Sequence, residues 1–334
     1  MPSVGILAVS HHTPERVVTN KDLESKLDTT DDWIQSRTGI RERRIASDDE
    51  TSSSLGAQAA KQALAACGCS PEELDLIVAA SMTPDTILPA VACRIQAALG
   101  AKNSGAFDVS IACSGFAYAL SMGASYISAG MARKVLVVGT DVMSRVMNWN
   151  DRGTCVLFGD GAGAVVLGEV ADGYGILAQD LGSNGAGGIH LTIPAGAASQ
   201  PPAEGHTTGE DFTLQMNGKE VFRFAVSAMG SSAARATEKA GLTADDIALF
   251  IPHQANARII DAAAKRLGVG TERVFVNVDR YGNTSCASIP IALSEAVQEG
   301  RIQDGQHLVL VGFGGGLAWG SLVLRWGGLL PPTA

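Results

Sequence analysis

The stretch AFDVSIACSGF, residues 106–116, carries the strongest fold signal in the chain. Its first six residues are mostly apolar and predict a buried strand, and the alanine-rich segment from about Ser114 to Ala129 predicts a helix. Cys113 stands at the junction between the two. We expect the positive end of the helix dipole to favour a thiolate at this position.

Further strands and helices alternate on both sides of this stretch. Apolar runs predict strands at residues 74–79 and 134–138, the second ended by Gly139, and residues 90–99 predict a helix that ends at Gly100. The same order returns later in the chain, which predicts two halves with one plan. The later elements are strands at residues 247–251, 274–278 and 307–311, the last ended by Gly312, and helices at residues 256–267 and 288–298, the first ended by Gly268.

Strands that alternate with helices and read as continuous apolar runs are typical of parallel sheets covered on both faces. Two such units predict an α/β fold with two sheets and with helices between and outside them. We place the boundary after residue 173, which gives an N-terminal half of residues 1–173 and a C-terminal half of residues 174–334. The Gly-, Pro- and Ala-rich residues 184–211 predict a long irregular loop of the kind that borders a site.

Composition limits the class of protein. The chain has 334 residues, of which 46% are hydrophobic and 18% charged, as in a globular enzyme with a large buried core. No apolar run approaches the ~20 residues that span a membrane, and no basic segment precedes the N-terminal apolar stretch, so we expect a cytoplasmic protein without membrane contact. The net charge of −9 argues against nucleic-acid binding. We expect the six cysteines to be reduced, and all but Cys113 to fill the core.

Two more polar residues follow predicted strands. His253 comes after the strand at residues 247–251, and Asn283 comes after the one at residues 274–278. Functional side chains in doubly covered α/β sheets cluster beyond the carboxyl ends of strands, so we expect Cys113, His253 and Asn283 to meet in one zone between the halves. A thiolate, an imidazole and a carboxamide are the groups needed for acyl transfer through a thioester and for stabilising an enolate oxygen.

Six motifs are spread over nearly the whole chain: Trp33 with Arg37-Thr38-Gly39-Ile40, Ala112-Cys113-Ser114-Gly115-Phe116, Phe158-Gly159-Asp160-Gly161-Ala162-Gly163-Ala164, His253-Gln254-Ala255-Asn256, Gly282-Asn283-Thr284-Ser285, and Gly312-Phe313-Gly314-Gly315-Gly316. With them the chain resembles β-ketoacyl-acyl carrier protein synthase III, the initiating condensing enzyme of type II fatty acid synthesis in the thiolase-like superfamily. The resemblance implies a thiolase-like α/β fold whose two halves form five layers, α-β-α-β-α. It also implies an acyltransferase that condenses an acyl-CoA primer, expected to be acetyl-CoA, with malonyl-acyl carrier protein and releases carbon dioxide.

The resemblance also implies a role for each matching residue. Cys113 would be acylated, His253 and Asn283 would stabilise the enolate oxygen, and the backbone N–H groups of Cys113 and Gly315 would form an oxyanion hole. The CoA thioester is a substrate, so no cofactor is implied, and Cys67-Gly68-Cys69 lacks the spacing of a zinc site, so no metal is expected. The residues implied to bind CoA are Trp33, Arg37, Arg152, Gly218 and Asn256.

Arg258, Lys265 and Arg266 share one face of the predicted helix at residues 256–267. This basic face, extended by Arg223, suits the docking of an acidic carrier protein, and an ordinary solvated helix surface is the alternative.

The resemblance further implies a homodimer in which Thr86-Ile87-Leu88-Pro89 closes the partner's acyl pocket, where Leu88 leaves more room than the aromatic residue of several relatives. Two other functions stay open. A related thiolase-like acyltransferase of secondary metabolism would use the same nucleophile with a different second substrate. A non-enzymatic carrier-binding protein would have no use for an intact set of Cys113, His253 and Asn283.

Overall fold

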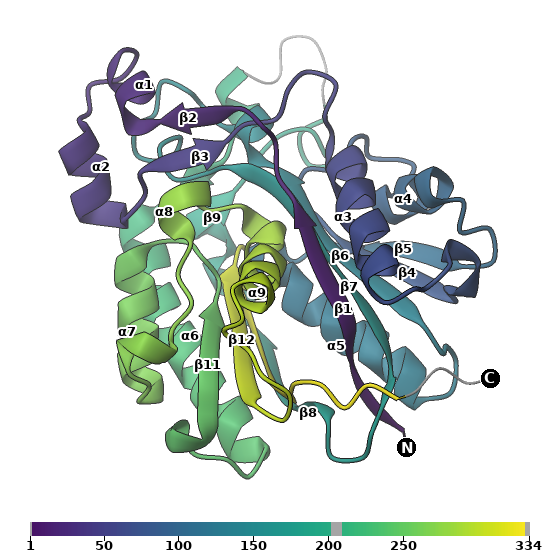
Figure 1. The fold of residues 1–334 in the computed structure, drawn as a ribbon. Coiled ribbons are helices and arrows are strands. Elements are labelled where there is room, and N and C mark those ends of the chain that lie inside the picture. The colour runs from purple at the N-terminus through teal and green to yellow at the C-terminus, as the bar shows by residue number, and fades with distance from the viewer. Residues whose placement is uncertain (1, 202–208, 331–334) are drawn as a thin grey trace.

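The computed structural model describes residues 2–201 and 209–330, which form two main β-sheets with helices between and outside them (Figure 1). The strands are β1 (Ser3–His12), β2 (Val17–Thr19), β3 (Glu42–Arg44), β4 (Leu76–Ala80), β5 (Gly105–Val109), β6 (Val135–Val142), β7 (Asp160–Val170), β8 (Gly175–Ser183), β9 (Leu191–Thr192), β10 (Gln215–Met216), β11 (Ile247–Pro252), β12 (His307–Gly314) and β13 (Ala318–Arg325). The α-helices are α1 (Asn20–Glu24), α2 (Asp31–Thr38), α3 (Ser52–Ala66), α4 (Val91–Leu99), α5 (Gly115–Ser128), α6 (Gly218–Lys239), α7 (Ala257–Leu267), α8 (Val278–Tyr281) and α9 (Ser288–Gln298).

The two sheets have equivalent strand orders. The first is β1-β7-β6-β4-β5 and the second, read in the same direction, is β8-β13-β12-β11. The strands β4, β5 and β6 pair in parallel, as do β11 and β12, whereas β1 and β7 in the first sheet and β8 and β13 in the second pair antiparallel with their neighbours. All strands of the first sheet lie within residues 3–170, and all strands of the second lie within residues 175–325.

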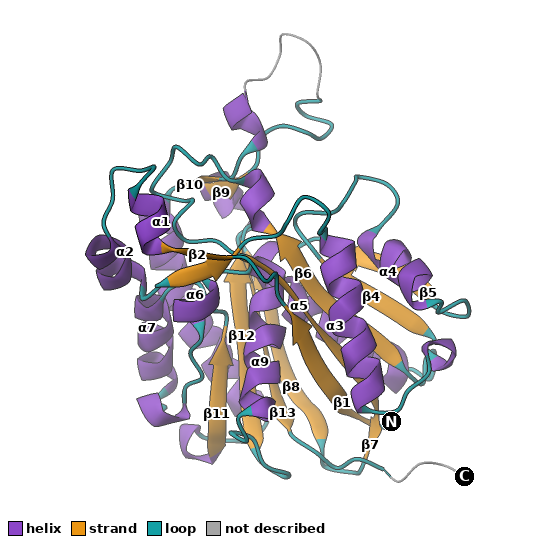
Figure 2. Cartoon of the chain, turned by 45° about the horizontal axis from the view of Figure 1, so that its top comes forward, coloured by secondary structure: helices purple, strands orange, loops and turns teal. Residues whose placement is uncertain are grey.

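Helices cover and separate the sheets in five layers. The helices α5 and α9 lie between the sheets, α3 and α4 cover the outer face of the first sheet, and α6 and α7 cover the outer face of the second (Figures 1 and 2). The helix α5 buries residues on most of its circumference, as its alanine-rich sequence requires. The five-layer arrangement predicted from the resemblance is confirmed. In residues 2–201 and 209–330, no helix has both the length and the apolar character needed to cross a membrane.

Several element boundaries are confirmed. The helix α9 spans residues 288–298, as the sequence pattern predicts. The helices α4 and α7 end at Gly100 and Gly268, whose φ angles of +73° and +87° lie in the left-handed region. A residue with a Cβ adopts this conformation only at a cost, so these glycines fix where the two helices stop.

The predicted strand at residues 274–278 is wrong. Val274 alone forms an isolated bridge to β11, and no strand follows it in this segment. The buried side chain of Gln254 satisfies this backbone instead, because its Nε2 donates to the Phe275 carbonyl (3.1 Å) and its Oε1 accepts the Asn277 N–H (2.9 Å). A backbone paired with a side chain in this way needs no neighbouring strand. The apolar run therefore signals burial here, not strand pairing.

Two predicted strand ends are also wrong. The strand β6 continues through Gly139 to Val142, and β12 continues through Gly312 to Gly314. A Cβ at Gly139 would lie 2.2 Å from the carbonyl oxygen of Cys286. This glycine permits a close backbone approach inside the core, where a larger residue would separate the two segments.

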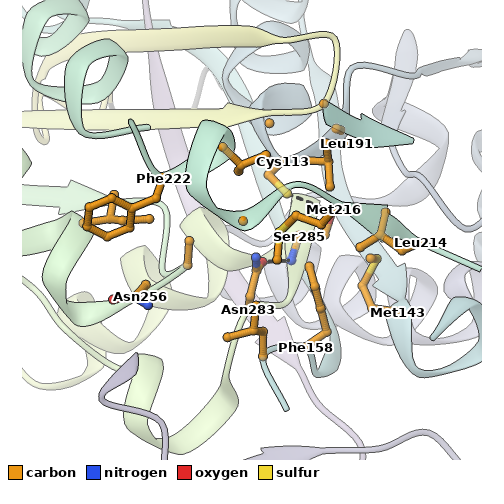
Figure 3. Close-up of a pocket in the computed structure, with 18 of the residues that line it drawn as sticks. Cys113, Met143, Phe158, Leu191, Leu214, Met216, Phe222, Asn256, Asn283 and Ser285 are labelled. Atoms are coloured by element: carbon orange, nitrogen blue, oxygen red, sulfur yellow. Dashed lines mark hydrogen bonds between the residues drawn. The ribbon is translucent and has the colours of Figure 1, made fainter. Parts of the chain in front are cut away.

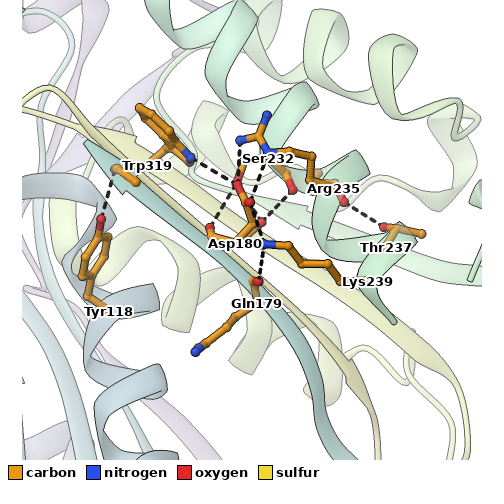
Figure 4. A network of polar contacts seen from close by, with 11 residues as sticks. Tyr118, Gln179, Asp180, Ser232, Arg235, Thr237, Lys239 and Trp319 are labelled. Atoms are coloured by element: carbon orange, nitrogen blue, oxygen red, sulfur yellow. Dashed lines mark hydrogen bonds and ion pairs between the residues drawn. The ribbon is translucent and has the colours of Figure 1, made fainter. Parts of the chain in front are cut away.

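A polar network fastens α6 to the second sheet (Figure 4). The carboxylate of Asp180 on β8 lies 2.6 Å from Arg235 and 3.0 Å from Lys239 on α6, and it accepts hydrogen bonds from Ser232 (2.9 Å) and Trp319 (3.2 Å). Burial alone would raise the pKa of Asp180, but these cationic and hydroxyl donors outweigh burial and hold the pKa well below its usual range. The network fixes the helix whose first turns line the cavity described below.

Candidate active site

Cys113 lies in the short 3-10 turn Ala112–Ser114 (η2), which joins the end of β5 to the start of α5. Ala112 has a φ of +48°, a left-handed conformation that a residue with a Cβ adopts only under constraint. The strain places Cys113 in the first turn of the helical segment, where backbone N–H groups have no partner within the helix. The Cys113 side chain is buried, and its Sγ donates to Ser285 Oγ at 3.5 Å.

His253 follows β11 directly. Its backbone N–H donates to the Val311 carbonyl (2.7 Å), and its ring packs edge-on to Phe313 with 5.5 Å between ring centroids. The side chain is fully buried, and neither ring nitrogen has a hydrogen-bond partner among the described residues. Burial lowers the pKa of His253 to about 3, so the ring is neutral at physiological pH. A neutral, unpartnered imidazole offers one donor and one acceptor to a bound molecule.

Asn283 is held by its backbone and its side chain. Its N–H donates to the Leu157 carbonyl (2.8 Å), and its own carbonyl accepts the Gly159 N–H (3.1 Å). The side-chain Oδ1 accepts the Ser285 N–H at 2.9 Å. Because a backbone N–H can only donate, this contact assigns the oxygen, and the amide nitrogen is left as a donor.

Cys113, His253 and Asn283 line one cavity of about 320 Å³ between the two halves. Figure 3 shows Cys113 and Asn283 among the residues of this cavity. Apolar side chains form most of its wall. Burial raises the pKa of the Cys113 thiol to about 12, more than the Ser285 hydroxyl lowers it. The expectation of a resting thiolate is therefore wrong, because the loss of hydration on burial disfavours the charged form of the thiol.

The end of β12 presses against the nucleophile turn. A Cβ at Gly314 would lie 2.6 Å from the Cys113 nitrogen, so only glycine allows this contact. The next residue, Gly315, lines the cavity beside Cys113. Among the backbone hydrogen bonds that the described residues form outside helices and strands, none has the Cys113 N–H or the Gly315 N–H as its donor. These are the two N–H groups that the resemblance implies for the oxyanion hole.

Most of the residues implied to bind CoA line the same cavity. Trp33, Arg37, Gly218 and Asn256 line it, and Arg152 lies beside Trp33. The guanidinium groups of Arg37 and Arg152 lie 5.0 and 5.4 Å from the centre of the indole ring. A purine sandwiched between the indole ring and one of these guanidinium groups needs them about 7 Å apart, twice a van der Waals contact. An arginine that takes part in such a sandwich must therefore move away from the ring.

The basic residues of α7 are exposed, as their spacing predicts. Arg258, Lys265 and Arg266 face solvent, and the apolar residues between them are buried. Asp261 is also exposed on this helix, so the face is not uniformly basic. Arg223 is exposed on α6 and pairs with Glu220 at 3.1 Å.

Leu88 lies outside the cavity of its own chain. It is 83% exposed, and the adjacent Ile87 is 84% exposed, in the loop before α4. Two neighbouring apolar side chains this open are unusual on a monomer surface. Any contact of Leu88 with an acyl pocket requires a second copy of the chain.

Comparison with known proteins gives these residues a context. Family models for 3-oxoacyl-[acyl-carrier-protein] synthase III and for its C-terminal region match residues 107–185 and 237–326. The chain is 53% identical over 325 residues to the β-ketoacyl-[acyl-carrier-protein] synthase III of Symbiobacterium thermophilum. This alignment covers 97% of this chain and 98% of that protein. The chain belongs to the β-ketoacyl-acyl carrier protein synthase III family.

Solved structures agree with this assignment. The crystal structure of β-ketoacyl-[acyl carrier protein] synthase III from Thermus thermophilus has a TM-score of 0.91 at 50% identity and covers 97% of this chain and 100% of that one. The priming β-ketosynthase from the R1128 polyketide biosynthetic pathway has a TM-score of 0.90 at 40% identity and covers 97% of this chain and 96% of that one. The chain is therefore a condensing acyltransferase with the thiolase-like fold.

The cavity also contains residues that the sequence analysis did not assign. Phe313 packs on His253, Ser285 contacts Cys113 and Asn283, and Leu191–Ile193 form part of the wall. The loop predicted to border a site, residues 184–211, does so through this last segment, and its residues 202–208 lie outside the described chain. Ser285 and Phe313 stand inside two of the quoted motifs, so the motifs themselves carried the signal.

The described residues contain no group of three or more His, Cys, Asp or Glu side chains that could hold a metal ion.

The raised pKa of Cys113 predicts a distinctive pH dependence for alkylation of its thiol by iodoacetamide. The thiolate fraction of a group with a pKa near 12 rises about tenfold per pH unit below that value. We expect the rate of Cys113 alkylation, followed by peptide mass spectrometry, to rise steadily between about pH 6 and pH 9. A plateau with a midpoint below about pH 8 would show a stabilised thiolate and contradict this account.

Proposed function

We propose that this protein initiates type II fatty acid synthesis by condensing an acyl-CoA primer with malonyl-acyl carrier protein. The observation that carries the proposal is that Cys113, His253 and Asn283 line one cavity in which the His253 ring has no hydrogen-bond partner among the described residues. Relatives at about half identity bear the name of this activity, whereas the polyketide priming enzyme is more distant. This difference favours fatty acid initiation over a role in secondary metabolism.

The first half-reaction acylates the enzyme. Cys113 Sγ attacks the thioester carbonyl of acyl-CoA, and the oxyanion is stabilised by the N–H groups of Cys113 and Gly315. Collapse of the tetrahedral intermediate breaks the bond to the CoA sulfur, which leaves with the proton that Cys113 gave up. The products are acyl-Cys113 and free CoA.

The second half-reaction forms the carbon–carbon bond. The malonyl thioester loses carbon dioxide, and the electron pair of the broken bond passes into an enolate. An N–H of neutral His253 and the amide nitrogen of Asn283 donate to the enolate oxygen. The carbanion attacks the acyl-Cys113 carbonyl, and the Cys113 sulfur leaves and takes up a proton. The product is a 3-oxoacyl-acyl carrier protein, and no cofactor enters the reaction.

The division of work between the two donors and the nucleophile can be tested. His253→Ala and Asn283→Ala each remove one donor to the enolate oxygen, a loss typically worth ~2.7–4 kcal/mol. We expect decarboxylation of malonyl-carrier protein to fall by about 10²–10³, with acylation of Cys113 far less affected. Radiolabelled carbon dioxide release and acyl-enzyme formation measure the two steps separately. Equal losses in both steps would refute the assignment.

The exposed basic face of α7 is the proposed docking surface for the carrier protein. Changing Arg258, Lys265 and Arg266 together to Glu should raise the KM for malonyl-carrier protein and leave acylation by acetyl-CoA intact. The effect should weaken as salt increases, since exposed charges act on the rate of encounter.

A matched control changes Lys61, Lys102 and Arg133 to Glu, because all three are exposed on the first half and the net charge changes equally. We expect normal carrier kinetics from this control. Unchanged carrier kinetics in the α7 variant at low ionic strength, or equal losses in both variants, would exclude α7 as the docking site.

We further propose a homodimer in which Leu88 reaches the acyl pocket of the partner. Leu88→Phe should shorten the accepted acyl-CoA primers and Leu88→Ala should lengthen them, because a few methylenes change discrimination by ~1–3 kcal/mol. Initial rates across acyl-CoA lengths, on dimers confirmed by sedimentation, provide the readout. Met131→Ala is the control, since Met131 is an exposed apolar residue elsewhere. An unchanged profile in both Leu88 variants would leave Leu88 without a role in selectivity.

A further inference from the structure

A second buried thiol lies beside the nucleophile turn. Cys286 belongs to the 3-10 turn Ser285–Ala287 (η8), which leads into α9 as the turn Ala112–Ser114 leads into α5. Both turns open with a residue in the left-handed region, since Ser285 has a φ of +51° and Ala112 has one of +48°. Cys286 therefore holds the position in the second half that Cys113 holds in the first, and the reaction described above does not use it.

The Cys286 thiol contacts the backbone of the nucleophile turn. Its Sγ donates to the Ala112 carbonyl oxygen at 3.1 Å. That carbonyl belongs to the same peptide group as the Cys113 N–H, which is one of the two proposed oxyanion donors. A hydrogen bond to the carbonyl of a peptide fixes the peptide plane and polarises its N–H. The hydrogen bond from Cys286 to the Ala112 carbonyl thus influences the Cys113 N–H through the peptide group that the two atoms share.

The thiol is held in the state that can donate. Cys286 is fully buried, and burial, together with the nearby Asp141 carboxylate, raises the pKa of its thiol well above the ordinary value. It therefore stays protonated, whereas a thiolate could not donate to a carbonyl. The thiol is a weak donor, but inside a closed core it competes with no water.

Cys286 is itself fixed from two sides. Its backbone N–H donates to Asp141 Oδ2 at 3.0 Å, and its carbonyl oxygen packs against Gly139. The other oxygen of Asp141 accepts from the loop that follows β4, so this fully buried carboxylate ties η8 to the first half. Its remaining donors are Ser81 Oγ, Met82 N, Thr83 N and Thr83 Oγ1.

We propose that Cys286 is a positioning residue that orients and polarises the Ala112–Cys113 peptide for oxyanion stabilisation. The proposal rests on the function given above. It predicts that Cys286 affects steps that form a tetrahedral oxyanion at Cys113, and not reactions of the Cys113 sulfur that form none.

The test compares two reactions of Cys113. Acylation by acetyl-CoA passes through an oxyanion, whereas alkylation by iodoacetamide is a displacement at carbon without one. Cys286→Ala should slow acylation about fivefold, the effect of one neutral hydrogen bond, and leave the alkylation rate within about twofold. Cys286→Ser keeps a donor and should restore acylation. Cys69→Ala, at a buried cysteine beyond the end of α3, should behave as wild type in both reactions.

The outcomes separate this proposal from the proposed function. If wild-type enzyme is not acylated by acetyl-CoA, the function fails. If wild type is acylated but Cys286→Ala slows acylation and alkylation equally, Cys286 only supports the local fold. Acylation of Cys286→Ala at the wild-type rate, or failure of Cys286→Ser to recover, overturns the positioning role. The thermal unfolding midpoint of each variant is measured, and only variants whose midpoint matches that of the wild type are compared.

Discussion

Two strained turns meet in the middle of the molecule, and their contact fixes the geometry of the cavity. The turns Ala112–Ser114 and Ser285–Ala287 each join one half of the chain to a helix of the central layer. Side chains of each turn contact the other, Cys113 with Ser285 and Cys286 with Ala112. Gly139 on β6 packs against Cys286 and Gly314 on β12 packs against Cys113, both too closely for a Cβ. Backbone strain of this kind persists only where the surrounding packing holds it, and here both sheets and both central helices do so. The two turns thereby hold Cys113 and Ser285 in the wall of the cavity.

Burial then determines the electrostatics of the cavity. A thiol with a raised pKa and an imidazole with a lowered pKa share a mostly apolar wall, so the resting pair is neutral. A neutral His253 can donate to an enolate oxygen without adding a charge that the cavity would have to solvate. Among the described residues, the two ring nitrogens of His253 have no hydrogen-bond partner. A substrate oxygen can therefore accept a hydrogen bond from the ring without displacing a protein contact.

The sequence correctly predicted those elements whose bounds depend on neighbouring residues in the chain. The helix at residues 288–298 and the helix ends at Gly100 and Gly268 follow from periodicity and glycine conformation. Cys113 and His253 follow strands that the apolar runs predict, whereas Asn283 lines the cavity although the strand expected before it does not form. The prediction of a strand at residues 274–278 was wrong because the side chain of Gln254 forms the hydrogen bonds that a neighbouring strand would otherwise form with this backbone. The prediction of a thiolate at Cys113 was wrong because the pKa of the thiol depends on its burial, which the whole fold determines. The roles of Asp141 and Cys286 could not be predicted from the sequence, because these two residues contact each other across about half the chain. The residues expected to bind CoA were predicted from the family resemblance alone.

The central claim is that Cys113 carries the acyl group between the two substrates. The most direct measurement is peptide mass spectrometry of the enzyme after acetyl-CoA, repeated after malonyl-carrier protein is added. The account predicts an acetyl group on the Cys113 peptide alone, absent in Cys113→Ser, that disappears as 3-oxobutanoyl-carrier protein forms. An acetyl group on another residue, or product formed by Cys113→Ser at the wild-type rate, would contradict it.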